Sequence, residues 1–235
     1  MKLIFAREGL RRGDVFSPNE SDRSHLLRVL RVSAGDELDV SDGRQMLRCA
    51  VDRAGKTIVL RVLDATPLED RRVLSLAIAR IDADRMAVAV SAAAQMAARD
   101  IWIVASERAG PVRLSIPRLD RVAREVAKQV GCPFLPAIRE MPGVDSLSHE
   151  IRARTAFLLD PDAAETLIEK FPRKPGEPVM LLIGPAGDFS DAEKTRMRAA
   201  GVLGVRLGDP VLRSETAAVA ALGIASTCLR MHSPR

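Results

Sequence analysis

The amino-acid sequence predicts an α/β protein in which a small all-β region precedes a mostly parallel sheet covered by helices on both faces. Three observations support this fold class. Short strand patterns separated by turn residues fill the first 70 residues, apolar runs alternate with helical segments from Val73 onward, and a polar stretch with Pro67 separates the two regions. We therefore expect two domains, residues 1–68 and 69–235.

The first region is predicted to form a small β-barrel with one helix. The helix, Ser21–Val29, begins with a residue type that caps helix N-termini, and Leu26 and Leu27 share one of its sides. The sequence Ser-Asp-Gly-Arg at residues 41–44 predicts a hairpin turn. The predicted strands are Lys2–Ala6, Asp14–Phe16, Glu37–Val40, Gln45–Val51 and Thr57–Leu63.

The second region is predicted to contain six strands and six helices in alternation. The strands are Leu74–Ile81, Asp100–Ala105, Leu135–Met141, Thr155–Leu159, Val179–Ile183 and Val202–Leu207. The helices are Arg85–Ala98, Arg118–Val130, Ser146–Arg154, Ala163–Phe171, Asp191–Ala200 and Glu215–Arg230. Ligands of open parallel sheets bind at the carboxyl ends of the strands. We therefore expect the chemistry in the loops after Leu159, Ile183 and Leu207.

Two of these loops are rich in glycine. Residues 183–190 read IGPAGDFS, in which Ser190 is the predicted N-cap of the next helix, and residues 207–217 read LGDPVLRSETA. Glycine lets backbone groups approach a flat ligand closely. Each loop alone also fits an ordinary strand-to-helix connection, but the pair favours a ligand site. Neither loop matches the dinucleotide-binding or P-loop motif.

Composition and charge exclude several classes of protein. Residues 1–70 hold equal numbers of basic and acidic side chains, so the net charge of +5 belongs to the remaining chain, which permits a phosphate-bearing partner without requiring one. With six phenylalanines, one tryptophan and no tyrosine, the chain offers little for a base-stacking platform. The absence of a long apolar run or an apolar leader predicts a soluble, cytoplasmic protein that does not bind membranes.

The cysteines and histidines predict no metal site and no disulfide framework. They stand far apart, with no CxxC pair and no ligand spacing between histidines. They are Cys49, Cys132, Cys228, His25, His149 and His232.

The two glycine-rich loops closely resemble the IGPEGGFS and LGxRILRxETA signatures of the small-subunit ribosomal RNA methyltransferase E family, which belongs to the SPOUT superfamily. The likeness covers most of the chain. Residues 25–31 resemble the HxxxVLR segment of the family's N-terminal PUA-like barrel. Residues 106–108 resemble its SER motif, and residues 129–131 stand where the family has EQxGR.

The resemblance implies a SPOUT-type α/β domain with a C-terminal deep trefoil knot, preceded by the PUA-like β-barrel, and a homodimer. It implies S-adenosylmethionine as cofactor and, as substrate, N3 of one uridine in the 16S rRNA of the assembled small ribosomal subunit. By carry-over, the cofactor-binding residues are Leu159, Ile183, Gly184, Pro185, Gly187, Leu207, Gly208, Val211 and Leu212.

Three residues are candidates for catalysis. Uracil N3–H is a weak acid, so the reaction needs a proton acceptor or stabilisation of negative charge on O2 and O4. Arg213 is the candidate for that stabilisation, and Glu215 and Thr216 are candidates to position Arg213 or to assist the departure of the proton. Glu215 also fits a purely structural role, as an acidic residue in the first turn of a helix.

Basic residues in both regions are candidates for RNA contact. The predicted RNA-binding residues are Arg23, Arg28, Arg31, Arg108, Arg121 and Arg124. Arg118, Arg121, Arg124 and Lys128 recur on one side of a predicted helix. A solvated helix face with Arg121 and Glu125 as an ion pair explains this group equally well.

The chain departs from the family pattern in informative places. Ala186 replaces the usual glutamate of the first loop, and Asp188 replaces its second glycine. Arg85 stands where a polar motif of the family begins with lysine, and the other polar residues of that motif are absent. Lys128 and Cys132 replace the glutamate and arginine of EQxGR. Two hypotheses follow: a divergent, active methyltransferase, or a family member that lost catalysis or changed its target and survives as an RNA- or ribosome-binding protein. An RNA-binding protein without catalysis has no need to bind S-adenosylmethionine, so measured affinity for this cofactor distinguishes many forms of the two hypotheses.

Overall fold

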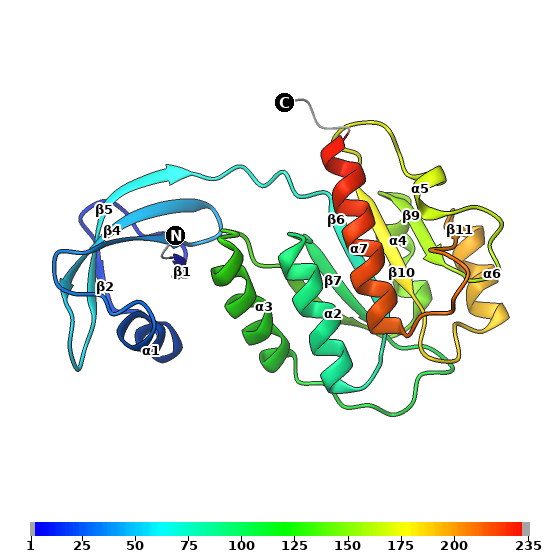
Figure 1. The fold of residues 1–235 in the computed structure, drawn as a ribbon, viewed down its shortest axis with the longest axis horizontal. Coiled ribbons are helices and arrows are strands. Elements are labelled where there is room, and N and C mark those ends of the chain that lie inside the picture. Colours follow the sequence, from blue (N-terminus) through cyan, green and yellow to red (C-terminus); the bar gives the residue numbers. More distant parts are fainter. Residues whose placement is uncertain (1–2, 232–235) are drawn as a thin grey trace. The chain divides into compact units, whose positions relative to one another are not determined.

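The computed structural model describes residues 3–231 and divides into two compact units (Figure 1). The first unit comprises Met1–Asp70 and Arg124–Leu135, and the second comprises Arg71–Ala123 and Pro136–Arg235. The first unit thus includes a segment that lies far from it in the sequence. Lys2, where the first predicted strand begins, and His232 lie outside the described residues.

The first unit contains a five-stranded sheet and helix α1, Glu20–Arg28. The strand order is β1 (Leu3–Phe5), β3 (Glu37–Ser41), β4 (Gln45–Arg53), β5 (Val59–Pro67) and β2 (Val15–Phe16). β1 pairs with β3 in parallel, and the other pairs are antiparallel. The predicted turn between β3 and β4 is confirmed, with Gly43 in the left-handed region at a φ of 83°. Leu26 and inward residues of β3, β4 and β5 form the core.

The predicted N-cap of α1 is wrong. The side chain of Asn19 accepts the hydrogen bond from the backbone N–H of Asp22, so the helix begins before Ser21. The Ser21 hydroxyl instead donates to the Glu125 carboxylate over 3.2 Å. Ser21 therefore helps to hold the segment 124–135 in the first unit.

Helix α3, Ile116–Val130, contributes its second half to the first unit. Lys128 Nζ lies 2.8 Å from Asp22 Oδ1, and both side chains are buried. Ala127 packs against Leu3 and Phe5. This overturns the assignment of Lys128 to a basic surface, because its ammonium group is neutralised inside the unit rather than presented to solvent.

The second unit contains a six-stranded sheet in which every pair of neighbours is parallel. The strand order is β11 (Leu203–Val205), β9 (Thr155–Leu159), β10 (Val179–Ile183), β6 (Leu74–Ala79), β7 (Asp100–Val104) and β8 (Ala137–Met141). β6, β7 and β10 are buried along their whole length, as the apolar runs predict. The α/β class with a parallel sheet is therefore confirmed.

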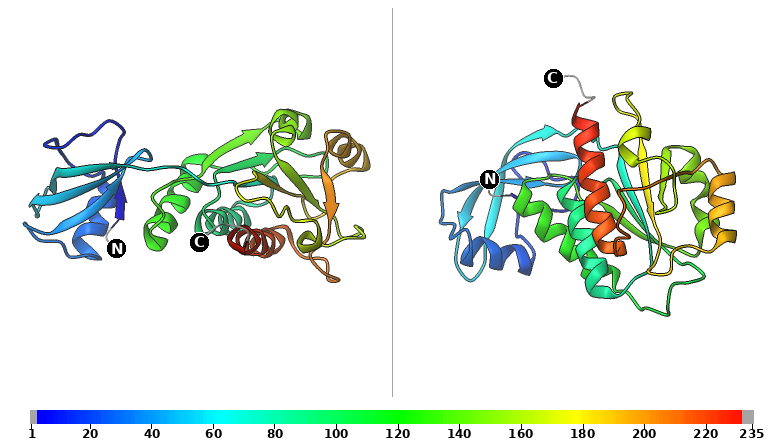
Figure 2. Two further views of the ribbon diagram at one scale, coloured as in Figure 1. Left: turned by 90° about the horizontal axis from the view of Figure 1, so that it is seen from above. Right: turned by 45° about the vertical axis from the view of Figure 1, so that its right-hand side comes forward.

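Helices cover both faces of this sheet (Figures 1 and 2). α2 (Ala83–Gln95) and α7 (Ser214–Met231) lie side by side on one face, and α4 (Ser148–Arg152) and α6 (Asp191–Ala199) lie on the other. Because β6 neighbours β10, the strand order reverses between them, and this is where open parallel sheets bind their ligands.

Several of the predicted helices differ from the structure, and α3 begins at Ile116 rather than at the predicted Arg118. The segment Ala163–Phe171 contains only the short α5, Leu167–Lys170, because Thr166 forms a parallel bridge with Arg206 and caps the helix. The segment Ser146–Arg154 divides into a 3₁₀ turn, Val144–Leu147, and α4. α2 begins earlier than predicted because Asp82 caps it.

Candidate active site

A pocket of about 260 Å³ lies at the carboxyl ends of β6, β9, β10 and β11 in the second unit. It is lined by the residues that follow these strands and by the segment that leads into α7. The three loops expected to carry the chemistry therefore meet at one place. All of the predicted cofactor residues except Gly187 line the pocket: Leu159, Ile183, Gly184, Pro185, Leu207, Gly208, Val211 and Leu212.

The loop after β10 has a shape that depends on Gly184. A Cβ atom on Gly184 would lie 2.7 Å from a carboxylate oxygen of Asp188, so only glycine leaves room for that side chain. Asp188 has a φ of 58°, in the left-handed region, and its Oδ1 accepts a hydrogen bond of 2.7 Å from the Phe189 backbone N–H. The loop ends at the predicted N-cap Ser190, which is confirmed and forms a capping box with Glu193.

The start of α7 is joined to the same loop. The buried Ser214 hydroxyl donates to the Gly184 carbonyl oxygen over 2.7 Å. Gly208 is open on the side where a side chain would project, since the nearest atom to its ideal Cβ position is Pro210 Cδ at 4.0 Å. The pocket wall at Gly208 is thus exposed backbone, which suits a flat ligand.

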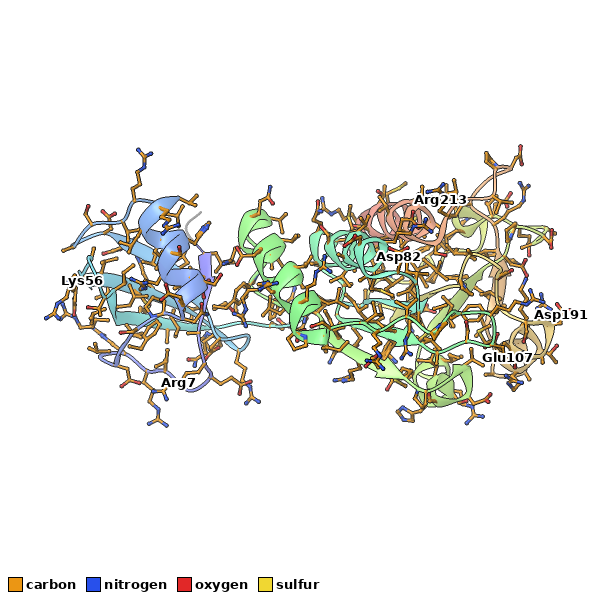
Figure 3. The ribbon with its side chains drawn as sticks, turned by 90° about the horizontal axis from the view of Figure 1, so that it is seen from below. Arg7, Lys56, Asp82, Glu107, Asp191 and Arg213 are labelled. Carbon is orange, nitrogen blue, oxygen red and sulfur yellow. The ribbon has the colours of Figure 1, made fainter. Side chains whose placement is uncertain are left out.

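The three catalytic candidates have different surroundings. Arg213 directly precedes α7, lines the pocket and is exposed (Figure 3). Thr216 is exposed on the first turn of α7 and is not among the lining residues. Glu215 is mostly buried, and within residues 3–231 no ion pair joins it to Arg213.

Glu215 instead faces Arg85, a residue that was recognised only as a departure from the family pattern. Arg85 Nε lies 3.8 Å from Glu215 Oε1 and 3.0 Å from Asp82 Oδ2, and Arg85 also lines the pocket. Glu215 Oε2 is buried and has no hydrogen-bond partner among the described residues. The charge of Arg85 therefore faces one oxygen of this carboxylate, and the other oxygen has no partner among the described residues.

A group of charged residues lies beside the pocket, and Asp188 is the one member that the sequence singled out. Lys194 of α6 contacts both Asp160 and Asp188, which line the pocket, and Arg198 contacts Asp160. Burial alone would lower the pKa of Lys194, but its hydrogen bonds and charge interactions with the two aspartates outweigh this and raise the pKa. Lys194 therefore remains a cation in a shielded position.

The arginines proposed to bind RNA fall in both units, and several already have partners. Arg108 Nη1 donates to the Gly187 carbonyl oxygen over 2.8 Å, and the Arg124 guanidinium lies 5.2 Å from the Phe5 ring centroid. Arg23 bonds to Glu20 and to the Lys56 carbonyl oxygen. The remaining three have exposed side chains: Arg28, Arg31 and Arg121.

Within residues 3–231, no group of three or more histidine, cysteine or acidic side chains is placed to hold a metal ion. Burial raises the pKa of the Cys49 thiol to about 12, so this cysteine is an inert core residue. None of the helices in this range is long and apolar enough to cross a membrane.

Comparisons with known proteins place these features in context. Residues 68–226 match the RNA methyltransferase domain family. The chain is 27% identical over 213 residues to the ribosomal RNA small subunit methyltransferases E of Mycobacterium bovis and Mycobacterium tuberculosis, an alignment that covers 85% of this chain and 81% of each relative. The crystal structure of a ribosomal RNA small subunit methyltransferase E from Neisseria gonorrhoeae, bound to S-adenosyl methionine, superposes with a TM-score of 0.84 at 24% identity and covers 97% of both chains.

Proposed function

The chain belongs to the RNA methyltransferase domain family, and from this premise we propose that it transfers a methyl group from S-adenosylmethionine to N3 of a uridine in the 16S rRNA of the small ribosomal subunit. The observation that carries the proposal is the meeting of both glycine-rich loops at one pocket on the carboxyl edge of the parallel sheet. The names of the mycobacterial relatives support the choice of RNA.

The residues that line the pocket are suited to binding S-adenosylmethionine. Apolar side chains such as Leu159, Ile183 and Leu207 offer a surface for an adenine ring, and the open side of Gly208 leaves backbone groups free for hydrogen bonds. When bound, the cofactor supplies an electrophilic methyl group on a positively charged sulfur.

The residues of this chain act on the uracil. Arg213 presents a planar cation at the pocket, where it stabilises negative charge that develops on the uracil carbonyl oxygens. Glu215 does not line the pocket, and its buried Oε2 has no partner among residues 3–231, so its part in the proposal is to assist the departure of the N3 proton from behind the lining. Arg85 offsets the negative charge of Glu215 from a distance of 3.8 Å. The remaining rate enhancement comes from holding the two reactants in line.

We also propose the larger architecture that the family resemblance implies. The chain then forms a deep trefoil knot, a rare exception to the usual rule against knots, and acts in the cytoplasm as a homodimer whose PUA-like first unit binds RNA. The Ser214–Gly184 hydrogen bond joins the start of α7 to the loop after β10, two segments of the proposed knot. The exposed Arg28 and Arg31 are the candidate phosphate contacts of the first unit.

Two measurements test the function. Calorimetry of the purified protein should show one site for S-adenosylmethionine per protomer, and the absence of any heat at millimolar ligand would remove the catalytic proposal and favour an RNA-binding protein that has lost its activity. Mass spectrometry of rRNA nucleosides should then show N3-methyluridine that disappears when the gene is deleted. An unchanged content of this nucleoside would contradict the proposed target.

A further inference from the structure

Lys194 connects two of the loops that line the pocket. Its Nζ atom lies 3.2 Å from Asp160 Oδ1 and 2.5 Å from Asp188 Oδ2. Asp160 directly follows β9 and Asp188 lies in the loop after β10, and both line the pocket. Lys194 is not itself a lining residue, so it influences a ligand only through the two aspartates.

The contact with Asp160 is shielded from water. The side chains of Lys194 and Asp160 are only 11% and 5% exposed, so their attraction is weakly screened. Removal of the ammonium group would leave the carboxylates of Asp160 and Asp188 on neighbouring loops without the cation that joins them. Breaking a buried pair in this way is strongly unfavourable, and separation of the two loops would relieve it.

Asp188 has little freedom to find another partner. Its backbone is in the left-handed region, its Oδ1 accepts the Phe189 N–H, and its carboxylate fills the space beside Gly184. Oδ2 is the oxygen that contacts Lys194. Because Asp188 stands where the family pattern has glycine, the connection through Lys194 is a property of this chain rather than of the signature it resembles.

We propose that Lys194 is a positioning residue for the cofactor pocket, which holds the loops after β9 and β10 together through Asp160 and Asp188 and thereby increases the affinity for S-adenosylmethionine. This inference rests on the proposed function. It assigns Lys194 a role in binding rather than in the methyl transfer itself.

The test compares Lys194→Met with a matched control, Arg198→Met. Arg198 Nη2 lies 3.1 Å from Asp160 Oδ2, so the control removes a cation from the same carboxylate, and the Lys194–Asp188 contact stays in place. Calorimetry should show that Lys194→Met weakens S-adenosylmethionine binding roughly tenfold, whereas Arg198→Met changes the dissociation constant less than about twofold. Lys194→Arg should recover part of the affinity, since a guanidinium can also join two carboxylates.

A second variant keeps the test informative if Lys194→Met folds poorly. Asp188→Asn preserves size and the bond to Phe189, and it should weaken binding without adding to the effect of Lys194→Met. In both variants the KM for S-adenosylmethionine should rise, and any fall in the turnover rate at saturating cofactor should be the smaller effect.

Several outcomes would overturn the inference. Lys194→Met that melts at a lower temperature but binds S-adenosylmethionine as tightly as the wild type has lost only a structural contact. Equal weakening by Arg198→Met means that the charge on Asp160, and not the connection to Asp188, sets the affinity. A wild-type protein that binds no S-adenosylmethionine would defeat the proposed function itself, and the role of Lys194 with it.

Discussion

At the scale of single residues, Arg213 distinguishes a catalytic role from a structural one. If it stabilises charge on the uracil oxygens, Arg213→Ala should lower the single-turnover methylation rate by roughly 100-fold and leave cofactor affinity nearly unchanged. Lysine at this position should recover little, because a point charge cannot replace the planar fork of donors. The exposed side chain of Arg213 and its lack of an ion pair with Glu215 among residues 3–231 favour this outcome.

The competing role for Arg213 makes a different prediction. If Arg213 only fastened the loop before α7, Arg213→Ala would lower cofactor affinity and melting temperature together, and Glu215→Gln would do the same. The two roles are distinguished by measuring the dissociation constant, the melting temperature and the methylation rate of Arg213→Ala, Arg213→Lys and Glu215→Gln. An unchanged rate in Arg213→Ala would remove this residue from the mechanism.

Gly208 carries the second prediction at the residue scale. Gly208→Val should abolish S-adenosylmethionine binding, because a branched side chain would fill the space beside the exposed backbone. The overall fold should be little affected, since the position has no positive φ and the nearest atom to an added Cβ is 4.0 Å away. Circular dichroism and calorimetry together check this, and a variant that binds normally would show that the ligand lies elsewhere.

At the scale of secondary-structure elements, the capping box at the start of α6 stabilises the helix that follows the loop after β10. Ser190→Ala removes the side chain that accepts the Glu193 N–H, and should destabilise the protein by about 1 kcal/mol, which is roughly 2–4 °C in melting temperature. Thr195→Ala is the control, because Thr195 lies in the middle of the same helix, away from the N-cap, and its side chain is exposed. Equal melting temperatures for Ser190→Ala and the wild type would argue against the cap.

The elements also show what local sequence patterns can and cannot predict. Strand ends, glycine-rich turns and the Ser190 cap are local signals, so the parallel sheet and the meeting of three loops followed from the sequence. The ion pairs of Arg85 with Glu215 and of Lys194 with Asp188 depend on packing between separate segments. The prediction of a helix over Ala163–Phe171 was wrong for the same reason, since the bridge between Thr166 and Arg206 outweighed helix propensity.

At the scale of the whole molecule, the neighbouring helices α2 and α7 present apolar side chains to solvent. Val88 of α2 is 47% exposed and Val219 of α7 is 43% exposed. We expect these helices to be covered by a second copy in a homodimer. Light scattering at micromolar concentration should give about twice the chain mass of 25.5 kDa, and Val88→Asp with Val219→Asp should shift the mass toward one chain. A single-chain mass for the wild type would contradict the dimer.

The passage of α3 into the first unit limits how modular this protein can be. A gene fragment that ends at Asp70 would encode every strand of the five-stranded sheet, yet it would lack the lysine that neutralises Asp22 and the alanine that packs on Leu3 and Phe5. Recombination at one site in the polar stretch before Val73 would therefore transfer an incomplete domain. Exchange of the complete first unit between relatives requires three crossovers, one after Asp70 and one on each side of residues 124–135, or later adaptation of residues 124–135 to their new neighbours.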